Sequence, residues 1–317
     1  MSGRPAARRR LTILVGILLF VMVAPWLAPR SPELQEDPAG ARYLPPLTRA
    51  FALRIDPFHL RIVTHLRQTP EGWEVERAGR IDSVSAAALL GPPETRFYLL
   101  GTDGLGRDLL SRVLSGARHS LGIAALSVVL AMLFGTAAGA AAGLLGGLGD
   151  ALIMRGVDVV MSIPRVLVYL VCAALFPPSS LLLVLVLGAT TWTGLARIVR
   201  AEMMSIRGSD LALGARAVGS RPLRVVLLHL LPQMGPVLAT TASLRFADTL
   251  LLESALSLLG LGPPAVSLGA IMGSGRDVMA DAWWVVVWPG VVISATVGTL
   301  RAAAAGLFRL ADPPSLS

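Results

Sequence analysis

Three long stretches of this sequence contain no Asp, Glu, Lys or Arg, and they constrain its fold more than any other feature. They are 120–149, 166–196 and 282–300. A helix needs roughly 20 mostly apolar residues to cross a bilayer, because backbone polar groups cannot stay unpaired in hydrocarbon. Since 54% of the 317 residues are hydrophobic and only 15% are charged, the sequence predicts an integral membrane protein.

The apolar runs predict an all-α membrane protein with six transmembrane helices. Besides the charge-free stretches, apolar runs follow the arginines at 8–10 and a basic segment at 209–232. The double proline at 177–178 separates two spans, because proline interrupts a helix. The expected spans are 11–27, 120–145, 157–176, 181–198, 233–252 and 283–300.

The basic residues predict the orientation of these spans. The net charge is +8, and all 28 strongly basic residues are arginine. Arginines in short loops mark the cytoplasmic side of a membrane protein, so this charge does not require a nucleic-acid partner. With both termini in the cytoplasm, every short-loop arginine lies inside: Arg155, Arg197, Arg200, Arg207, Arg216, Arg221, Arg224, Arg301 and Arg309.

The first apolar run can also be interpreted as a cleaved signal peptide. Arginines precede it, but Pro25 and Trp26 occupy the region where a small-x-small cleavage site would lie. We expect a retained span with its arginines in the cytoplasm.

A polar, proline-containing segment separates the first two spans. β-Branched residues alternate around Pro70-Glu71-Gly72, which predicts a short hairpin. The single cysteine and four scattered histidines predict no metal site. We expect four parts: a cytoplasmic N-terminus with the first span (1–29), an extracytoplasmic insert (30–98), a core with five spans (99–310) and a cytoplasmic tail (311–317).

Four ionisable residues fall within or beside the apolar runs: Arg165, Arg245, Asp248 and Glu253. Such residues often mark a substrate or ion path. Arg245 and Asp248 are three residues apart and can pair on one helix face, so a neutralised structural pair is the alternative. Glu253 lies at the outer end of its span, where we expect water to reach it.

The segment 209–232 interrupts the apolar pattern with arginines and helix-breaking residues. Ser209 is a good N-cap, and Asp210 suits the positive end of a helix dipole. Gly219 suits the left-handed turn that ends a helix, and Ser220 can cap a second one. The pattern predicts two short cytoplasmic helices, and both an ordinary loop and a docking element for another protein are compatible with it.

Several motifs, taken in order, resemble the permeases of ABC importers. LGARAVG (213–219) followed by HLLP (229–232) resembles their EAA loop, although Leu213 replaces its usual acidic residue. The chain also resembles the dipeptide/oligopeptide/nickel permease family, in its second-subunit (DppC/OppC-like) form, over about residues 99–290. The motifs that carry this are LLGTDGLGRDLLSRVLSGARHSL (99–121), DALIMRGVDVVMSIP (150–164), WTGLARIVRAEMMSIRGSD (192–210) and ESALSLLGLG (253–262).

The resemblance implies half of a transport pore. It implies a type I ABC importer permease fold in a bacterial inner membrane, a homologous permease partner and an extracytoplasmic solute-binding protein. Two ATPase subunits would hold ATP and Mg²⁺. A phosphate-binding loop needs a lysine, which this sequence lacks, so we do not expect the chain itself to be an enzyme. Peptide is the favoured cargo, and nickel or a related small solute is also compatible.

The resemblance also assigns two groups of residues. The residues expected to dock on the ATPase are Ser209, Asp210, Leu211, Gly214, Ala215, Arg216, Ala217, Gly219, His229 and Pro232. The residues expected at the outer entrance for substrate are Gly101, Thr102, Asp103, Gly106, Arg107 and Asp108, with the three charged ones as ordered polar anchors.

Two other function classes make different demands. An ion-coupled secondary transporter would use ionisable residues at membrane depth, but no inverted repeat of broken helices is apparent. Gly147-Leu148-Gly149-Asp150 fits the GxGD pattern of intramembrane aspartyl proteases. Their catalytic pair needs a second aspartate, and no tyrosine here is followed by one, so we expect an ordinary loop aspartate.

Overall fold

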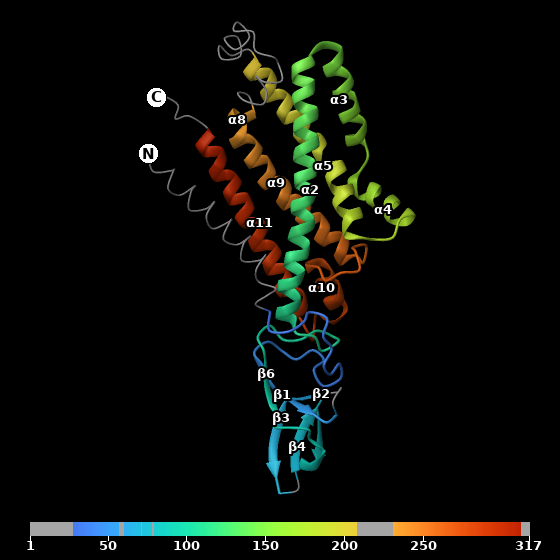
Figure 1. The fold of residues 1–317 in the computed structure, drawn as a ribbon, viewed down its shortest axis with the longest axis vertical. Coiled ribbons are helices and arrows are strands. Elements are labelled where there is room, and N and C mark those ends of the chain that lie inside the picture. The colour runs from blue at the N-terminus through green and yellow to red at the C-terminus, as the bar shows by residue number, and fades with distance from the viewer. Residues whose placement is uncertain (1–27, 57–59, 71, 78, 208–230, 312–317) are drawn as a thin grey trace.

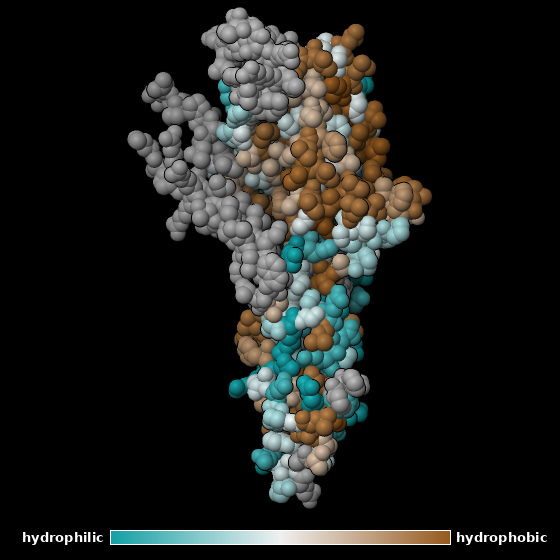
Figure 2. All heavy atoms as spheres, in the orientation of Figure 1, coloured by the Kyte–Doolittle hydropathy of each residue, from teal (hydrophilic) through white to brown (hydrophobic). Residues whose placement is uncertain are grey.

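The computed structural model shows a bundle of long helices with a small β unit at one end (Figure 1). It describes residues 28–56, 60–70, 72–77, 79–207 and 231–311. The first expected span and most of the segment 209–232 therefore lie outside the described residues. Hydrophobic residues cover much of the visible face of the bundle, whereas hydrophilic residues predominate near the junction with the β unit (Figure 2).

The β unit contains two three-stranded antiparallel sheets, with strand orders β2-β1-β6 and β3-β4-β5. The expected all-α class is therefore wrong for this part of the chain. Strand β1 pairs with β6, about 45 residues later in the sequence, and local hydrophobic periodicity does not reveal such pairing. The strands are β1 (Thr48–Arg54), β2 (Leu60–Val63), β3 (His65–Thr69), β4 (Gly72–Arg77), β5 (Arg80–Val84) and β6 (Glu94–Tyr98).

The hairpin expected around residues 70–72 corresponds to β3 and β4. These strands pair from His65 opposite Glu76 to Thr69 opposite Gly72. Apolar side chains of β1, β2, β4 and β5 form one shared core, so both sheets contribute to the same unit. Its fully buried members are Leu53, Val63, Val75 and Val84.

Asp37 ties the loop before β1 to both sheets. Its side chain is 4% exposed and accepts hydrogen bonds from the backbone N–H of Gly40 and of Ile62 on β2, both at 2.9 Å. Arg77 of β4 donates to both carboxylate oxygens, at 2.7 and 3.1 Å. Burial alone would raise the pKa of Asp37, but these donors outweigh it and hold the pKa below the usual 3.8.

Asp37→Asn should therefore destabilise the β unit in a pH-dependent way. We expect a loss of about 2 kcal/mol at pH 7, because the amide cannot accept both bonds from Arg77. A carboxyl whose folded-state pKa is lowered contributes stability above its unfolded pKa and loses it as the pH falls through the lower folded value. Hydrogen exchange of peptides from β1 and β2 should thus differ between wild type and variant at pH 7, and the difference should shrink as the pH falls below 3.8. A difference that stays constant with pH would contradict this account.

Among the described residues, the bundle consists of long helices and several shorter ones. Their bounds are α2 (Leu109–Leu145), α3 (Gly147–Ser162), α4 (Arg165–Leu175), α5 (Ser180–Arg207), α8 (Leu231–Gln233), α9 (Gly235–Leu258), α10 (Leu268–Gly275), η4 (Arg276–Val278) and α11 (Trp284–Ala311). Among the described residues, α2, α5 and α11 are each long and apolar enough to span a membrane. Helix α9, which corresponds to the fifth expected span, carries three charged residues and does not meet that criterion.

The third expected span is not one continuous helix. Helices α3 and α4 meet at an angle of 74°, and together they could form a single broken span or a re-entrant loop. The break lies at Ile163 and Pro164, both of which have extended backbone conformations. Proline disfavours helical geometry in the residue before it, so the sequence Ile163-Pro164 explains the break.

Helices α2 and α5 pack closely along a row of glycines. Gly135, Gly139 and Gly143 recur every four residues and face α5. A Cβ at Gly139 would lie 2.4 Å from the carbonyl oxygen of Ala196. Small residues let two helix backbones approach in this way within a membrane.

Three arginines expected in a cytoplasmic loop, Arg197, Arg200 and Arg207, instead lie on α5, which ends at Arg207. Arg200 pairs with Asp150 in the first turn of α3, and Arg197 pairs with Asp158. The GxGD aspartate is therefore in an ion pair between two helices rather than in a loop.

Candidate functional site

The structure describes only one residue of the expected ATPase-docking set. Pro232 lies in α8, exposed and just before α9. The other nine lie outside the described residues: Ser209, Asp210, Leu211, Gly214, Ala215, Arg216, Ala217, Gly219 and His229. Their role stays a prediction.

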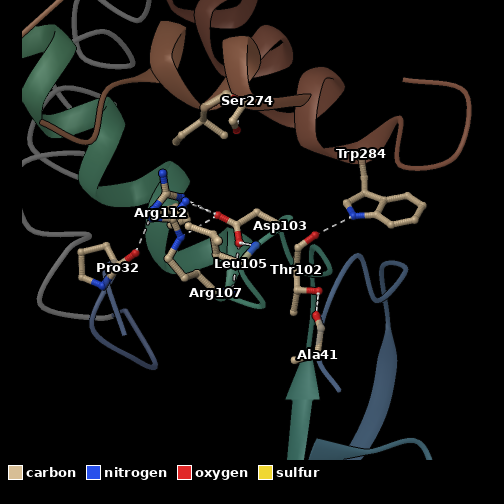
Figure 3. Close-up of polar contacts among 10 residues, drawn as sticks. Pro32, Ala41, Thr102, Asp103, Leu105, Arg107, Arg112, Ser274 and Trp284 are labelled. Carbon is tan, nitrogen blue, oxygen red and sulfur yellow. Dashed lines mark hydrogen bonds and ion pairs between the residues drawn. The ribbon is translucent and has the colours of Figure 1, made fainter. Parts of the chain in front are cut away.

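The motif at 101–108 forms a buried junction between the β unit and the bundle (Figure 3). The Thr102 hydroxyl donates to the carbonyl of Ala41 and accepts from the N–H of Leu44, while its own carbonyl accepts from the indole N–H of Trp284 at 3.0 Å. Gly101 has φ +84°, and a Cβ there would lie 2.5 Å from the Leu44 carbonyl oxygen. This crowding requires glycine.

Asp103 is the centre of this junction. It is 1% exposed, and one carboxylate oxygen accepts from the backbone N–H of Leu105 and of Arg107. The other oxygen contacts the guanidinium groups of Arg107, at 2.7 Å, and Arg112, at 3.2 Å. Arg112 also donates to the carbonyl of Pro32. One carboxylate thus connects the start of α2 to the segment before the β unit.

Asp108 begins α2. Its carboxylate caps the helix by accepting from the N–H of Ser111 at 2.8 Å. Arg30 approaches the same carboxylate at 3.6 Å and lies over the ring of Tyr98, 4.4 Å from its centroid. Burial raises the pKa of Tyr98 to about 12, despite the nearby Arg30.

The sequence analysis named Asp103, Arg107 and Asp108 as polar anchors but did not identify their partners. Arg30, Arg112 and Trp284 come from three segments that are distant in sequence or outside the motif. All three charged anchors of the motif are turned inward and paired. The geometry therefore supports a structural junction, and the motif's expected place at a substrate entrance stays a prediction.

Two charged residues of α9, Arg245 and Asp248, contact neighbouring helices of the bundle. Asp248 is half exposed and lies 3.8 Å from Arg301 of α11. Arg245 extends toward α5, where Gly194 leaves room for it: a Cβ at Gly194 would lie 2.3 Å from the guanidinium Nη2. Arg165, the first residue of α4, interacts electrostatically with both Arg245 and Asp248.

We call Arg165, Arg245, Asp248 and Arg301 the charged face. The expected pairing of Arg245 with Asp248 is not what the described residues show, because the ion pair of Asp248 is with Arg301. Tertiary packing of α11 beside α9 overrides the spacing along one helix. The sequence analysis missed Arg301 and Gly194 as members of this site. Arg301 directly follows a charge-free run and was assigned to a loop, and Gly194 has no functional side chain.

Glu253 does not join the charged face. It is completely buried, so the expectation that water reaches it is wrong for this chain. Ser257 and Ser254 of the same helix donate to its two carboxylate oxygens at 2.9 and 3.2 Å, and the Ser120 side chain of α2 lies beside it. Ser120 in turn accepts from the N–H of Leu268, the first residue of α10. The carboxyl group thus connects three helices.

Comparison with known proteins gives a consistent result. The family described as "Binding-protein-dependent transport system inner membrane component" matches residues 131–313. The di/tripeptide transport system permease protein DppC of Pseudomonas aeruginosa is 36% identical over 233 residues, which are 71% of this chain and 77% of that protein. The oligopeptide transport system permease protein OppC of Haemophilus influenzae is 32% identical over 224 residues, 70% of this chain and 72% of that protein.

A solved structure supports the fold. The chain resembles the MetNI methionine ABC transporter in an inward-facing conformation, with a TM-score of 0.54 and 18% identity, over 65% of this chain and 97% of that one. This likeness supports the type I importer permease fold expected from the sequence. The relatives are transport permeases, which favours this class over an ion-coupled transporter or an intramembrane protease.

Proposed function

Because the chain belongs to the family of binding-protein-dependent transport system inner membrane components, we propose that it forms half of the pore of an ATP-driven peptide importer. A homologous permease forms the other half. Two ATPase subunits holding ATP and Mg²⁺ drive the cycle, and an extracytoplasmic solute-binding protein delivers the cargo. Relatives named for dipeptide and oligopeptide transport support peptide as cargo over nickel.

The observation that carries this proposal is the charged face. Its Asp248 and Arg301 side chains are 50% and 58% exposed on the isolated chain, although they lie on helices of the membrane bundle. Lipid tails do not solvate such groups, so they face either a water-filled path or another protein. A second permease packed against this chain would provide both, with Arg165, Arg245 and Asp248 lining the path between them.

The remaining topology follows from the same proposal. Six spans, including the broken pair α3 and α4, cross the bacterial inner membrane with both termini in the cytoplasm. The β unit then lies outside, beside the solute-binding protein, and the segment 209–232 lies inside. The docking segment would transmit closure of the ATPase pair to the pore, as a two-state element biased by nucleotide.

Gly219→Val tests the coupling role of that segment. We expect the complex to assemble, and ATP hydrolysis to continue, while peptide uptake falls at least about tenfold, because valine resists the left-handed turn. Uptake and ATPase rates of the reconstituted complex measure this. Gly156→Val on α3 is the matched control, since a Cβ there meets nothing within 4 Å. Normal coupling in Gly219→Val would reject the docking role.

A further inference from the structure

The charged face carries more positive than negative charge. Among the described residues, it contains three guanidinium groups, those of Arg165, Arg245 and Arg301, and one carboxylate, that of Asp248. Glu253 is enclosed by serines several residues further along α9 and does not neutralise them. Arg301 was expected in a cytoplasmic loop, but it lies on α11 within the candidate membrane span 284–306. Such an excess of positive charge on membrane-spanning helices is costly unless an anion or water reaches it.

Asp248 does not hold its partner tightly. The 3.8 Å separation between its Oδ1 and Arg301 Nη2 is longer than the roughly 2.8 Å of a charge-assisted hydrogen bond. Both side chains are half exposed, so a visiting group can approach them. A guanidinium group presents paired N–H donors that match the two oxygens of a carboxylate.

We propose that the charged face binds the free C-terminal carboxylate of the peptide as it passes through the pore, an inference that rests on the proposed function. The cargo carboxylate takes the place of Asp248 beside Arg301, and the positive charges of Arg245 and Arg165 add to the attraction. Asp248 then competes for the same guanidinium group and helps release the cargo. A transport site needs a moderate affinity for its cargo, because the cargo must bind when it enters the pore and dissociate when it leaves.

The alternative neutralising group is an acidic residue of the partner permease. The 3.8 Å separation between Asp248 and Arg301 favours the cargo, because a permanent partner carboxylate would leave Asp248 without a function beside Arg301. The two readings differ in what a charge-removing variant changes: selectivity for cargo in one, and assembly of the two permeases in the other.

The experiment compares a dipeptide with its C-terminal amide in proteoliposomes that contain the complete complex. The affinity of the solute-binding protein for each compound is measured separately, and uptake is compared at saturating concentrations. We expect the ratio of acid to amide uptake to fall at least about fivefold in Arg245→Gln and in Arg301→Gln. Arg276→Gln is the control, because its exposed side chain pairs only with neighbouring Asp277 among the described residues and should leave the ratio unchanged.

Each outcome decides between the readings. If Arg245→Gln does not accumulate, Arg301→Gln still gives the answer, since its side chain is 58% exposed. An unchanged ratio in an assembled complex overturns the proposal, and loss of permease pairing without a change in ratio assigns the charge to the partner. If the wild-type complex hydrolyses ATP but takes up neither compound, the proposed function itself fails and the inference with it.

Discussion

Gly139→Val is expected to prevent α2 and α5 from packing and to remove most folded protein from the membrane. At this position an added Cβ would lie 2.4 Å from the Ala196 carbonyl oxygen and 2.7 Å from the Val199 Cβ. Because one of these atoms belongs to the backbone, a rotamer change cannot relieve the overlap, and the helices must separate. Overpacking of a tight interface usually costs about 1–3 kcal/mol. We expect separating α2 from α5 to cost more than that.

The measurement is the amount of protein in isolated membranes, together with its melting temperature in detergent. Gly122→Val on the same helix is the matched control, because a Cβ there meets nothing within 4 Å. Valine has a higher helix propensity than glycine in both variants, so only the contact with α5 distinguishes them. Equal accumulation and equal melting temperatures would show that the two backbones are not as close as the structure places them.

The glycine row illustrates how far the sequence could lead. Apolar runs without charge predicted α2, α5 and α11 correctly, because a membrane-spanning helix depends on local composition. The alanine and glycine residues of 120–145 allow close helix packing, but only the structure identifies α5 as the partner helix. Tertiary contacts decide which helix packs against α2, and no local pattern in a single sequence indicates that helix.

The errors have the same physical origin. The β unit was expected only as a hairpin, because β1 and β6 pair across many residues. The broken span at Ile163-Pro164 was overlooked because hydropathy continues through it while backbone geometry does not. The sequence spacing allowed Asp248 to pair with Arg245 on its own helix, as one of two alternatives, whereas the ion pair in the structure joins Asp248 of α9 to Arg301 of α11. Local composition thus predicted which segments form helices, whereas contacts between residues distant in sequence determine which side chains form the candidate site.

Asp103→Ala is expected to separate the β unit from the bundle. The substitution removes the carboxylate that contacts both Arg107 and Arg112, and Arg112 is only 6% exposed. Leaving a buried guanidinium group without its partner typically costs about 3–5 kcal/mol. The N–H groups of Leu105 and Arg107 lose their acceptor as well, so the turn before α2 should open.

The two halves should respond differently, because each has its own core. The β unit buries Leu53, Val63 and Val75, whereas the bundle near the junction buries Leu109 and Trp284. Limited proteolysis should therefore cleave Asp103→Ala within 99–108 and release a resistant fragment, while wild type stays intact. Asp277→Ala, whose side chain is 85% exposed beside Arg276, should behave as wild type, since exposed pairs contribute little. If Asp103→Ala resists cleavage as wild type does, the interface between the two parts depends on Arg30 and Thr102 rather than on Asp103, because these supply the other polar contacts across it.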